Sequence, residues 1–226
     1  MLQLFPMKIV ILSAGKGTRM NDLTLTVPKP LLKYKNKNLL EHKLDILPES
    51  TTEIIFVIGY LGEKIKEHFG DSYKNIPIRY VEQKEMKGTA DALWQCKDFL
   101  NEQFVVLMGD DLYNKDDLEK IYSIPKSKWA VLAYPDIPGI KAGKIVKDDQ
   151  GNLKEIYEDF DGSSPYNLLY TGACLLTPDI FTKEMTQLSN GEYGLPQTIT
   201  KFIGEKDIIV LETSNWIRIT APEDLI

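Results

Sequence analysis

The chain has 226 residues, 43% of them hydrophobic and 27% charged, which is the composition of an ordinary globular protein large enough for one good core. Its formal net charge of −6 argues against non-specific binding to nucleic acid, and no apolar run is long enough to cross a membrane. The two cysteines and two histidines show no metal-binding spacing, which argues against zinc and is typical of a reduced, cytoplasmic protein.

Strands and helices alternate in the first half of the chain. Apolar runs predict buried strands over 9–12, 53–59, 76–82 and 103–108. Apolar residues at helical spacing predict helices over 39–47, 62–69, 89–100 and 116–123, with Thr89 as the N-cap of the third. Such alternation predicts an α/β fold of three layers, in which helices cover both faces of a mainly parallel, Rossmann-like sheet.

After Pro125 the pattern changes to a smaller, β-rich portion. Strands are predicted over 128–134 and over 166–176, the latter interrupted at Gly172. Two more strands, over 144–146 and 153–158, flank the turn-forming sequence DDQGN. The remaining elements are predicted to be helices over 178–188 and 195–202, strands over 208–212 and 216–220, and a closing helix that opens at Pro222.

The segment that follows the first predicted strand has the composition of a phosphate-binding loop. Residues 13–19 read SAGKGTR, in which small side chains and two glycines let a ligand approach free backbone N–H groups. Arg19 adds a forked cation suited to phosphate, and Lys29 follows between two prolines that restrict the backbone. The loop lacks the Walker A pattern, and Met20 stands where a dinucleotide fingerprint needs glycine. These features favour another kind of triphosphate site over a plain glycine-rich turn.

Over a longer stretch, LSAGKGTRM at 12–20 and PKPLL at 28–32 resemble the signature of the sugar-1-phosphate nucleotidyltransferases, also called nucleotide-sugar pyrophosphorylases. The resemblance implies one domain over 7–226, with a nucleotide-binding half at 7–125, an acceptor-binding half at 126–226 and an extension at 1–6. It implies catalytic roles for Arg19 and Lys29. It also implies that the nucleotide is bound by Leu12, Ala14, Gly15, Gly17, Thr18 and Arg19.

A second motif resembles the base pocket of that family, in which Gln83, Gly88 and Thr89 would contact the nucleotide. A glutamine amide offers a donor and an acceptor side by side, as the edge of uracil or thymine requires. Gly88 would let a base lie against bare backbone. UTP or dTTP is therefore favoured and CTP stays open. Taken alone, Gln83 at a solvated strand end and an ordinary helix start would explain the same residues.

The sequence Met108-Gly109-Asp110-Asp111 places two carboxylates directly after a predicted strand. Side chains at the carboxyl end of a parallel strand point into the crevice where α/β sheets bind ligands. Magnesium takes oxygen ligands, mostly few carboxylates together with phosphates. The resemblance implies that Asp110 is the Mg²⁺ ligand and a catalytic residue, with Asp111 as a second ligand or support. Two turn carboxylates without a metal are the alternative.

The acceptor-binding residues implied by the resemblance are Gly143, Glu158, Tyr170 and Thr171. The sequence departs from the family here, because Asp159 stands where many members have lysine near the glutamate, and Tyr170 where many have asparagine. These departures leave the identity of the acceptor open.

The end of the chain, WIRITAPEDL at 216–225, resembles the family ending W-x-D-x-x-T-P-E-D-L. Arg218 replaces the aspartate that is often a second metal ligand. A cation cannot ligate magnesium, so Arg218 is expected to hold a phosphate of the acceptor. Otherwise the metal relies on Asp110, Asp111 and ligand oxygens, or the replacement marks reduced activity.

The resemblance implies an enzyme that transfers a nucleotidyl group from an NTP to a sugar 1-phosphate, with Mg²⁺ as cofactor and pyrophosphate as the second product. A cytidylyltransferase for a non-sugar phosphate and a regulatory module that binds nucleotide sugars without turnover are the alternatives. The partners are expected to be the NTP and the sugar 1-phosphate, with no nucleic acid and no membrane. A monomer or small homo-oligomer is expected.

Overall fold

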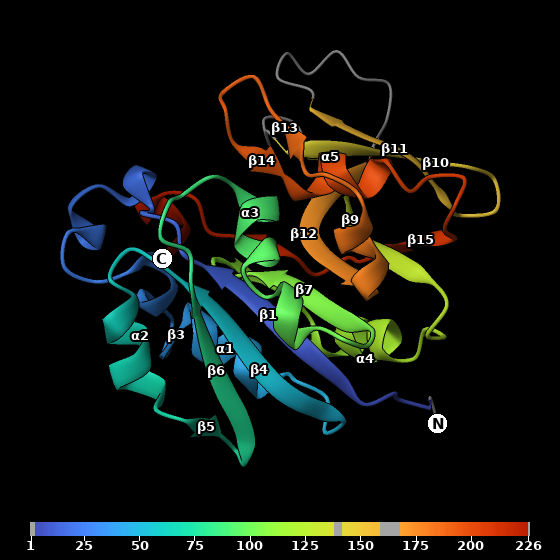
Figure 1. Cartoon of the computed structure of the whole chain (residues 1–226). Helices are drawn as coiled ribbons and strands as arrows, with labels where there is room; N and C mark the ends of the chain where they lie inside the picture. Colours follow the sequence, from blue (N-terminus) through green and yellow to red (C-terminus); the bar gives the residue numbers. More distant parts are fainter. Residues whose placement is uncertain (1–2, 138–141, 159–167, 226) are drawn as a thin grey trace.

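The computed structural model describes residues 3–137, 142–158 and 168–225, and one sheet runs through both halves of the chain (Figure 1). Its first part is parallel and consists of β1 (Met7–Ser13), β4 (Thr51–Ile58), β6 (Ile76–Glu82) and β7 (Phe104–Met108). Its second part consists of β9 (Trp129–Pro135), β10 (Gly143–Lys147), β11 (Leu153–Glu158), β12 (Leu168–Leu176) and β15 (Ile208–Glu212). The predicted α/β fold with a mostly parallel central sheet is confirmed.

The two parts join where β12 pairs antiparallel with β7, giving the strand order β11-β10-β12-β7-β1-β4-β6-β5, with β9 and β15 branching from β12. β1 lies between β4 and β7 and is buried along nearly its whole length. A parallel strand covered on both faces has no solvent side, which is why its sequence is a continuous apolar run. The division of function at residue 125 stays a prediction.

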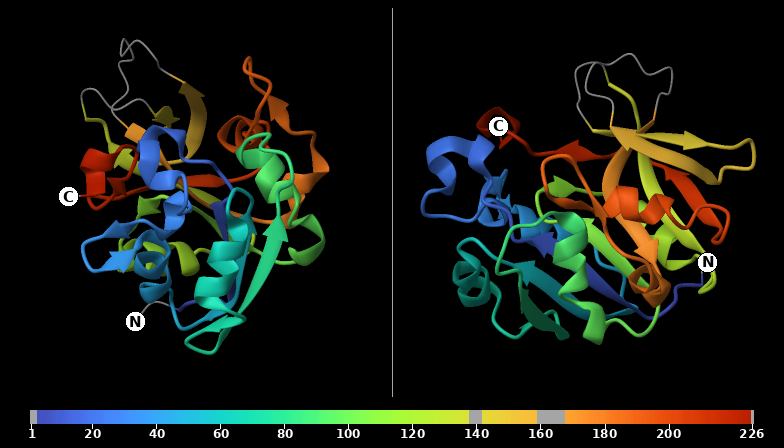
Figure 2. Two further views of the ribbon diagram at one scale, coloured as in Figure 1. Left: turned by 90° about the vertical axis from the view of Figure 1, so that its left-hand side faces the viewer. Right: turned by 45° about the horizontal axis from the view of Figure 1, so that its top comes forward.

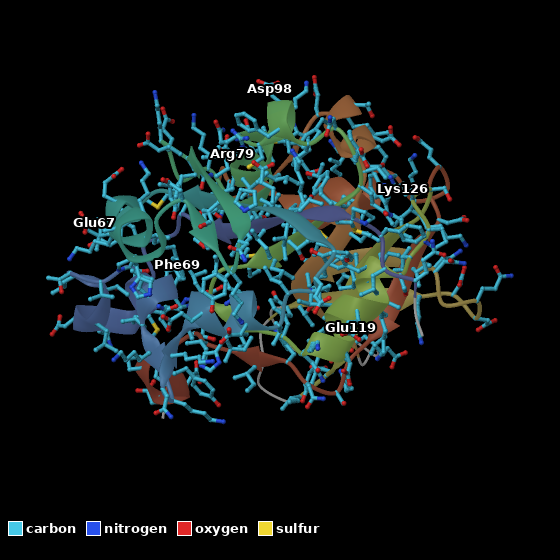
Figure 3. All side chains as sticks on the ribbon, turned by 90° about the horizontal axis from the view of Figure 1, so that it is seen from below. Glu67, Phe69, Arg79, Asp98, Glu119 and Lys126 are labelled. Atoms are coloured by element: carbon cyan, nitrogen blue, oxygen red, sulfur yellow. The ribbon has the colours of Figure 1, made fainter. Side chains whose placement is uncertain are left out.

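Helices cover the two faces of the sheet. They are α1 (Leu39–Asp45), α2 (Gly62–Phe69), α3 (Thr89–Trp94), α4 (Lys115–Tyr122) and α5 (Leu195–Thr200). On β1, Val10 and Leu12 face a core shared with α3 and α5, whereas Ile9 and Ile11 face a core shared with α1, α2 and α4. Figure 3 shows this second face, with Glu67 marking α2 and Glu119 marking α4. The alternation of side chains along one strand thus produces two cores.

Short elements complete the fold. Two-residue strands pair as β2 (Lys33–Tyr34) with β3 (Lys37–Asn38), β8 (Asp111–Leu112) with β16 (Ile217–Arg218), and β13 (Thr186–Gln187) with β14 (Tyr193–Gly194), while β5 (Ser72–Tyr73) pairs with β6. Segments of 3₁₀ helix span Thr18–Thr24, Lys29–Leu31, Lys97–Phe99, Pro178–Thr182 and Pro222–Leu225, the first of them broken by a kink at Asn21. The last of them lies beside the first, so the C-terminal end of the described chain reaches the loop after β1 (Figure 2).

Three predicted elements differ in the structure. The helix predicted over 178–188 is a 3₁₀ turn followed by β13, because Thr186 donates hydrogen bonds through its N–H to Thr198 Oγ1 and through its hydroxyl to Gln197 O, which hold the chain extended. The helix predicted over 89–100 ends at Trp94 and resumes as a 3₁₀ turn. Of the strand predicted over 216–220, only Ile217–Arg218 pairs.

The N-cap of α3 is Gly88 rather than the predicted Thr89. The Thr89 hydroxyl instead accepts a hydrogen bond from Leu195 N at 3.0 Å. A long-range partner therefore takes the oxygen that a local cap would use. No helix in the described part of the chain has the length and apolarity needed to cross a membrane; the cytoplasmic location and the oligomeric state stay predictions.

Asp45 at the end of α1 ties three elements together, because it accepts hydrogen bonds from Lys37, Lys74 and Tyr73. These bonds, first those of the two lysines, hold the pKa of Asp45 well below its usual range. A carboxyl with a lowered folded-state pKa stabilises the fold above its unfolded pKa of about 4, and that contribution is lost as the pH falls further.

Asp45→Asn is therefore expected to lower the free energy of unfolding at pH 7 and to have a smaller effect at pH 2.5. Urea unfolding of both proteins at the two pH values measures this difference. An equal effect at both pH values would show that the Asp45 carboxylate makes no pH-linked contribution.

Candidate active site

Three adjoining cavities open at the carboxyl ends of β1 and β7, where sheets of this class bind ligands. The loop cavity, of about 240 Å³, is lined by the loop at 12–19, Lys29 and Asp110. The helix cavity, of about 300 Å³, is lined by Gln83 and the start of α3, and the strand cavity, of about 380 Å³, by residues of β12 and β16. The Met108 side chain lines all three, so the cavities meet at the end of β7.

The predicted nucleotide-binding residues divide between two of these cavities. Those of the loop cavity are Leu12, Gly15, Gly17, Thr18 and Arg19. Those of the helix cavity are Leu12, Ala14, Gly15, Gln83, Gly88 and Thr89. The structure therefore brings together two motifs that are about seventy residues apart in the sequence, although their binding role stays a prediction.

Gly17 makes room for Lys29. The backbone of Gly17 has φ +64°, and a Cβ atom built there would lie 2.8 Å from Lys29 Cβ. Any other residue would be strained and would push the lysine stem aside. The Thr24 hydroxyl holds the same turn by donating to Gly17 O at 3.1 Å. The second glycine of the motif thus positions a cation that follows it by twelve residues.

Lys29 forms an ion pair inside the site. Its side chain is 10% exposed, and Nζ lies 2.5 Å from Asp110 Oδ2, while Asp110 keeps 33% of its own side chain exposed. Asp110 lines both the loop and the strand cavities, as does the exposed side chain of Arg19. Arg19 and Asp110 therefore stand at the boundary between these two cavities, and Lys29 pairs with Asp110 from the side of the loop cavity.

Asp111 differs from its neighbour because it is buried. Its carboxylate accepts a hydrogen bond from Trp216 Nε1 at 3.1 Å, and only 7% of the residue is exposed. Burial, and then the nearby charge of Asp110, raise the pKa of Asp111 above its usual range. Arg218 lies opposite Asp111 in the β8–β16 pair and also lines the strand cavity. Asp111 itself lines the strand cavity, and its role as a second ligand or as a support stays a prediction.

Lys43 is a buried cation of the site that sequence reasoning missed. It is fully buried on α1, and Nζ donates hydrogen bonds to Leu39 O at 3.1 Å and Gly109 O at 2.9 Å. Burial lowers the pKa of Lys43, and the charges of Asp110 and Asp111 partly offset that effect. The available signal was its position on the apolar face of α1, four residues after Leu39. A charged residue there needs a buried partner.

The side-chain amide of Gln83 is hydrogen-bonded to the protein itself. Its side-chain nitrogen Nε2 donates to Gly88 O at 3.1 Å and to Asp91 Oδ2 at 2.7 Å. Both amide hydrogens are therefore directed at the protein, and only the amide oxygen is left for a ligand. The expectation that Gln83 offers a donor and an acceptor side by side is wrong, because two acceptors on α3 and its cap take both hydrogens.

Four of the predicted acceptor residues, Gly143, Tyr170, Thr171 and Arg218, line the strand cavity. The Thr171 hydroxyl donates to Leu132 O at 2.9 Å, so it serves the sheet as well. Glu158 pairs with Gly143 between β11 and β10, and its side chain is not among those described. Asp159 lies outside the described residues.

The two halves of the chain meet across the helix cavity. Tyr193 N donates to Lys87 O at 2.6 Å, next to the bond from Leu195 N to Thr89. A Cβ atom on Gly88, which has φ +97°, would lie 2.5 Å from Tyr193 O. Only glycine allows β14 to approach this closely. β14 therefore forms one wall of the helix cavity.

Gly172 on β12 also allows a close approach, in this case by the Met108 side chain. Its backbone has φ +82°, and an added Cβ would lie 2.3 Å from Met108 Cγ. Gly191 has nearly the same conformation, φ +85°, but nothing lies within 4 Å of its added Cβ. Comparing the two positions separates backbone strain from the clash with Met108.

Gly172→Ala is expected to destabilise the protein by about 2–4 kcal/mol, the sum of a strained backbone and an overpacked neighbour. Gly191→Ala, its matched control, should cost only the backbone part, about 1 kcal/mol. Denaturant unfolding measures both. Equal losses would show that Met108 moves aside freely.

The chain is similar to known proteins over most of its length. The sequence model of the family described as nucleotidyl transferase matches residues 8–216. A UTP–glucose-1-phosphate uridylyltransferase of Haloferax volcanii, AglF, is 32% identical over 96% of this chain and 93% of that protein. The bifunctional protein GlmU of Methanocaldococcus jannaschii is 31% identical over 97% of this chain, which spans only 53% of that longer protein.

A solved structure shares the fold. The crystal structure of a UDP-glucose pyrophosphorylase in complex with UDP-glucose superposes with a TM-score of 0.87. The similarity covers 97% of this chain and 96% of the other at 25% identity. The arrangement of strands around the three cavities is therefore shared with a protein that binds a nucleotide sugar.

Proposed function

Because the chain belongs to the nucleotidyl transferase family and is an enzyme of that kind, we propose that it transfers a uridylyl group from UTP to a hexose 1-phosphate, releasing pyrophosphate. The observation that carries this proposal is the Lys29–Asp110 pair at the boundary of the loop and strand cavities. The triphosphate would lie in the loop cavity, the base in the helix cavity and the sugar phosphate in the strand cavity. The family match favours an enzyme over a module that only binds nucleotide sugars.

The reaction needs charge neutralisation more than proton transfer. A phosphate oxygen of the acceptor attacks the α-phosphorus of UTP, and the bond to the bridging oxygen of the leaving pyrophosphate breaks. The attacking oxygen is already ionised, so no side chain has to act as a base. Lys29, which is buried in the lining of the loop cavity, and Arg19, which is exposed in the same lining, would neutralise charge that develops on the phosphates.

The residues of the site fit a magnesium ion that arrives with the triphosphate. Mg²⁺ is usually held by one or two carboxylates together with phosphates, and Asp110 presents a partly exposed carboxylate between the two cavities. Within the described residues no group of three or more His, Cys, Asp and Glu side chains could hold a metal by itself. Bound there, the ion would supply further neutralisation of phosphate charge.

The helix cavity supports uracil as the base. Gln83 is left with an amide oxygen, which matches the N3–H donor of uracil or thymine. Met86, 42% exposed, adds apolar surface to the same cavity. UTP is preferred over dTTP because the relative of Haloferax volcanii is named for UTP.

Glucose 1-phosphate is the first acceptor to test, since both the curated relative and the solved structure are named for glucose compounds. Arg218, which lines the strand cavity, would hold the acceptor phosphate. The guanidinium group suits this role because its N–H donors match the oxygens of a phosphate in pairs.

Pyrophosphate release tests the proposal. UTP, dTTP, CTP, ATP and GTP are each combined with a panel of sugar 1-phosphates and with phosphocholine, in the presence of Mg²⁺. Release with UTP and a hexose 1-phosphate is the expected result. Release only with CTP and a non-sugar phosphate would establish the cytidylyltransferase alternative. Silence across the panel, with UDP-glucose still raising the melting temperature, would establish a binding module.

A further inference from the structure

The contacts of Gln83 fix which way its amide group faces. Gly88 O and the Asp91 carboxylate, the two groups that Gln83 Nε2 contacts, can only accept hydrogen bonds. If the amide turned over, its oxygen would face two acceptors without a proton between them. Gln83 is 5% exposed, so water cannot relieve such a contact at low cost.

Asp91 makes the stronger of the two contacts. Its Oδ2 lies 2.7 Å from Gln83 Nε2, against 3.1 Å for Gly88 O, and a hydrogen bond to a charged group is roughly twice as strong as a neutral one. Gln95 Nε2 donates to the other oxygen, Oδ1, at 3.4 Å, and so helps to hold the carboxylate from the next turn of the helix. Asp91 is thus a hydrogen-bond acceptor for Gln83 whose own position is held by Gln95.

Gln83 lines the helix cavity, and with Nε2 bonded to the protein its amide oxygen is the atom left for a ligand. Within the described part of the chain, no group donates a hydrogen bond to that oxygen. The oxygen is also not fully buried, so a ligand in the cavity can reach it. Uracil presents N3–H, a donor, at the centre of its pairing edge, whereas cytosine presents a lone pair at N3. An oxygen facing N3 therefore attracts uracil and repels cytosine.

We propose that Asp91 is a positioning residue that determines the choice of pyrimidine, by holding the Gln83 amide with its oxygen toward the base. The inference rests on the proposed function, since it refines the selection of UTP. Asp91 itself does not touch the base. It acts through Gln83, and its removal leaves the amide free to present either end.

The test compares Asp91→Ala, which removes the acceptor, with Asp91→Asn, which keeps an oxygen that can accept from Gln83. Asp98→Ala is the matched control, since Asp98 is an exposed acid just beyond the same helix and points away from the protein (Figure 3). For each protein, kcat and KM are measured with UTP and CTP. The affinities for both nucleotides are also measured by calorimetry without acceptor.

Asp91→Ala is expected to lower the preference for UTP over CTP by about tenfold, mainly through KM, with kcat for UTP within about twofold. Asp91→Asn should keep most of the preference, and Asp98→Ala all of it. A purely structural role would weaken both nucleotides equally.

An unchanged ratio in Asp91→Ala, or a wild-type protein that prefers CTP or binds neither nucleotide, would overturn the inference. Failure of the proposed function gives a different result. The protein would then turn over no NTP but still bind UTP more tightly than CTP. Loss of that difference in Asp91→Ala would support the positioning role of Asp91 without the proposed reaction.

Discussion

Lys29→Met is expected to lower kcat by about 10²–10³ while the protein stays folded. The methionine keeps an apolar stem to pack over Gly17 but removes the charge beside Asp110. In the proposed reaction that charge neutralises phosphate oxygens more strongly in the transition state than in the substrate complex, so the loss should appear in kcat rather than in KM.

Steady-state kinetics with UTP and the acceptor found in the panel measures the effect of Lys29→Met. Lys33→Ala is the control, because Lys33 is an exposed lysine four residues further along and loses the same charge. The Lys29 variant leaves Asp110 without its partner, but the Asp110 side chain is 33% exposed and water can solvate it. Near-normal turnover in a folded Lys29→Met protein would remove Lys29 from the catalytic set.

Asp110→Asn is expected to reduce turnover by a similar factor and, in addition, to raise the Mg²⁺ concentration needed for half-maximal rate. Asparagine has the same shape and still accepts a hydrogen bond from Lys29, so the change isolates the negative charge. A neutral amide is a much weaker magnesium ligand than a carboxylate.

Titration of Mg²⁺ in the wild type, Asp110→Asn and the exposed control Asp98→Asn separates the two effects. A parallel measurement of Mn²⁺ binding in the presence of UTP gives a readout that is independent of turnover. If Asp110→Asn leaves both the Mg²⁺ dependence and the Mn²⁺ affinity unchanged, then Asp110 is the partner of Lys29 and not a metal ligand.

Lys29 and Asp110 are far apart in the sequence, and their pairing could not be predicted from it. The loop at 12–19 and the Met108–Asp111 segment were each recognisable because short stretches of backbone and their side chains carry the signal. Their pairing through Lys29 and Asp110 depends on β1 and β7 being neighbours in the sheet. Strand order follows from packing of the whole chain.

Elements with strong local periodicity were predicted correctly, among them α2, β6 and the β10–β11 hairpin. The segment 178–188 was not, because hydrogen bonds from Thr186 to the region of α5 outweigh its helical pattern. Thr89 failed as a cap for the same reason, since its hydroxyl bonds Leu195 across the site. Long-range contacts override propensity wherever the local preference is small.

The sequence by itself thus determined the fold class, the family resemblance and about half of the residues that line the three cavities. Those properties are local: apolar periodicity, glycines where the backbone must turn, and charges at strand ends. Only the tertiary structure decided that Lys43 is buried and donates to Gly109 O, that Asp111 accepts a hydrogen bond from Trp216, and that Asp91 accepts one from the amide of Gln83. The direction in which a polar side chain points depends on the partners that the rest of the fold brings to it.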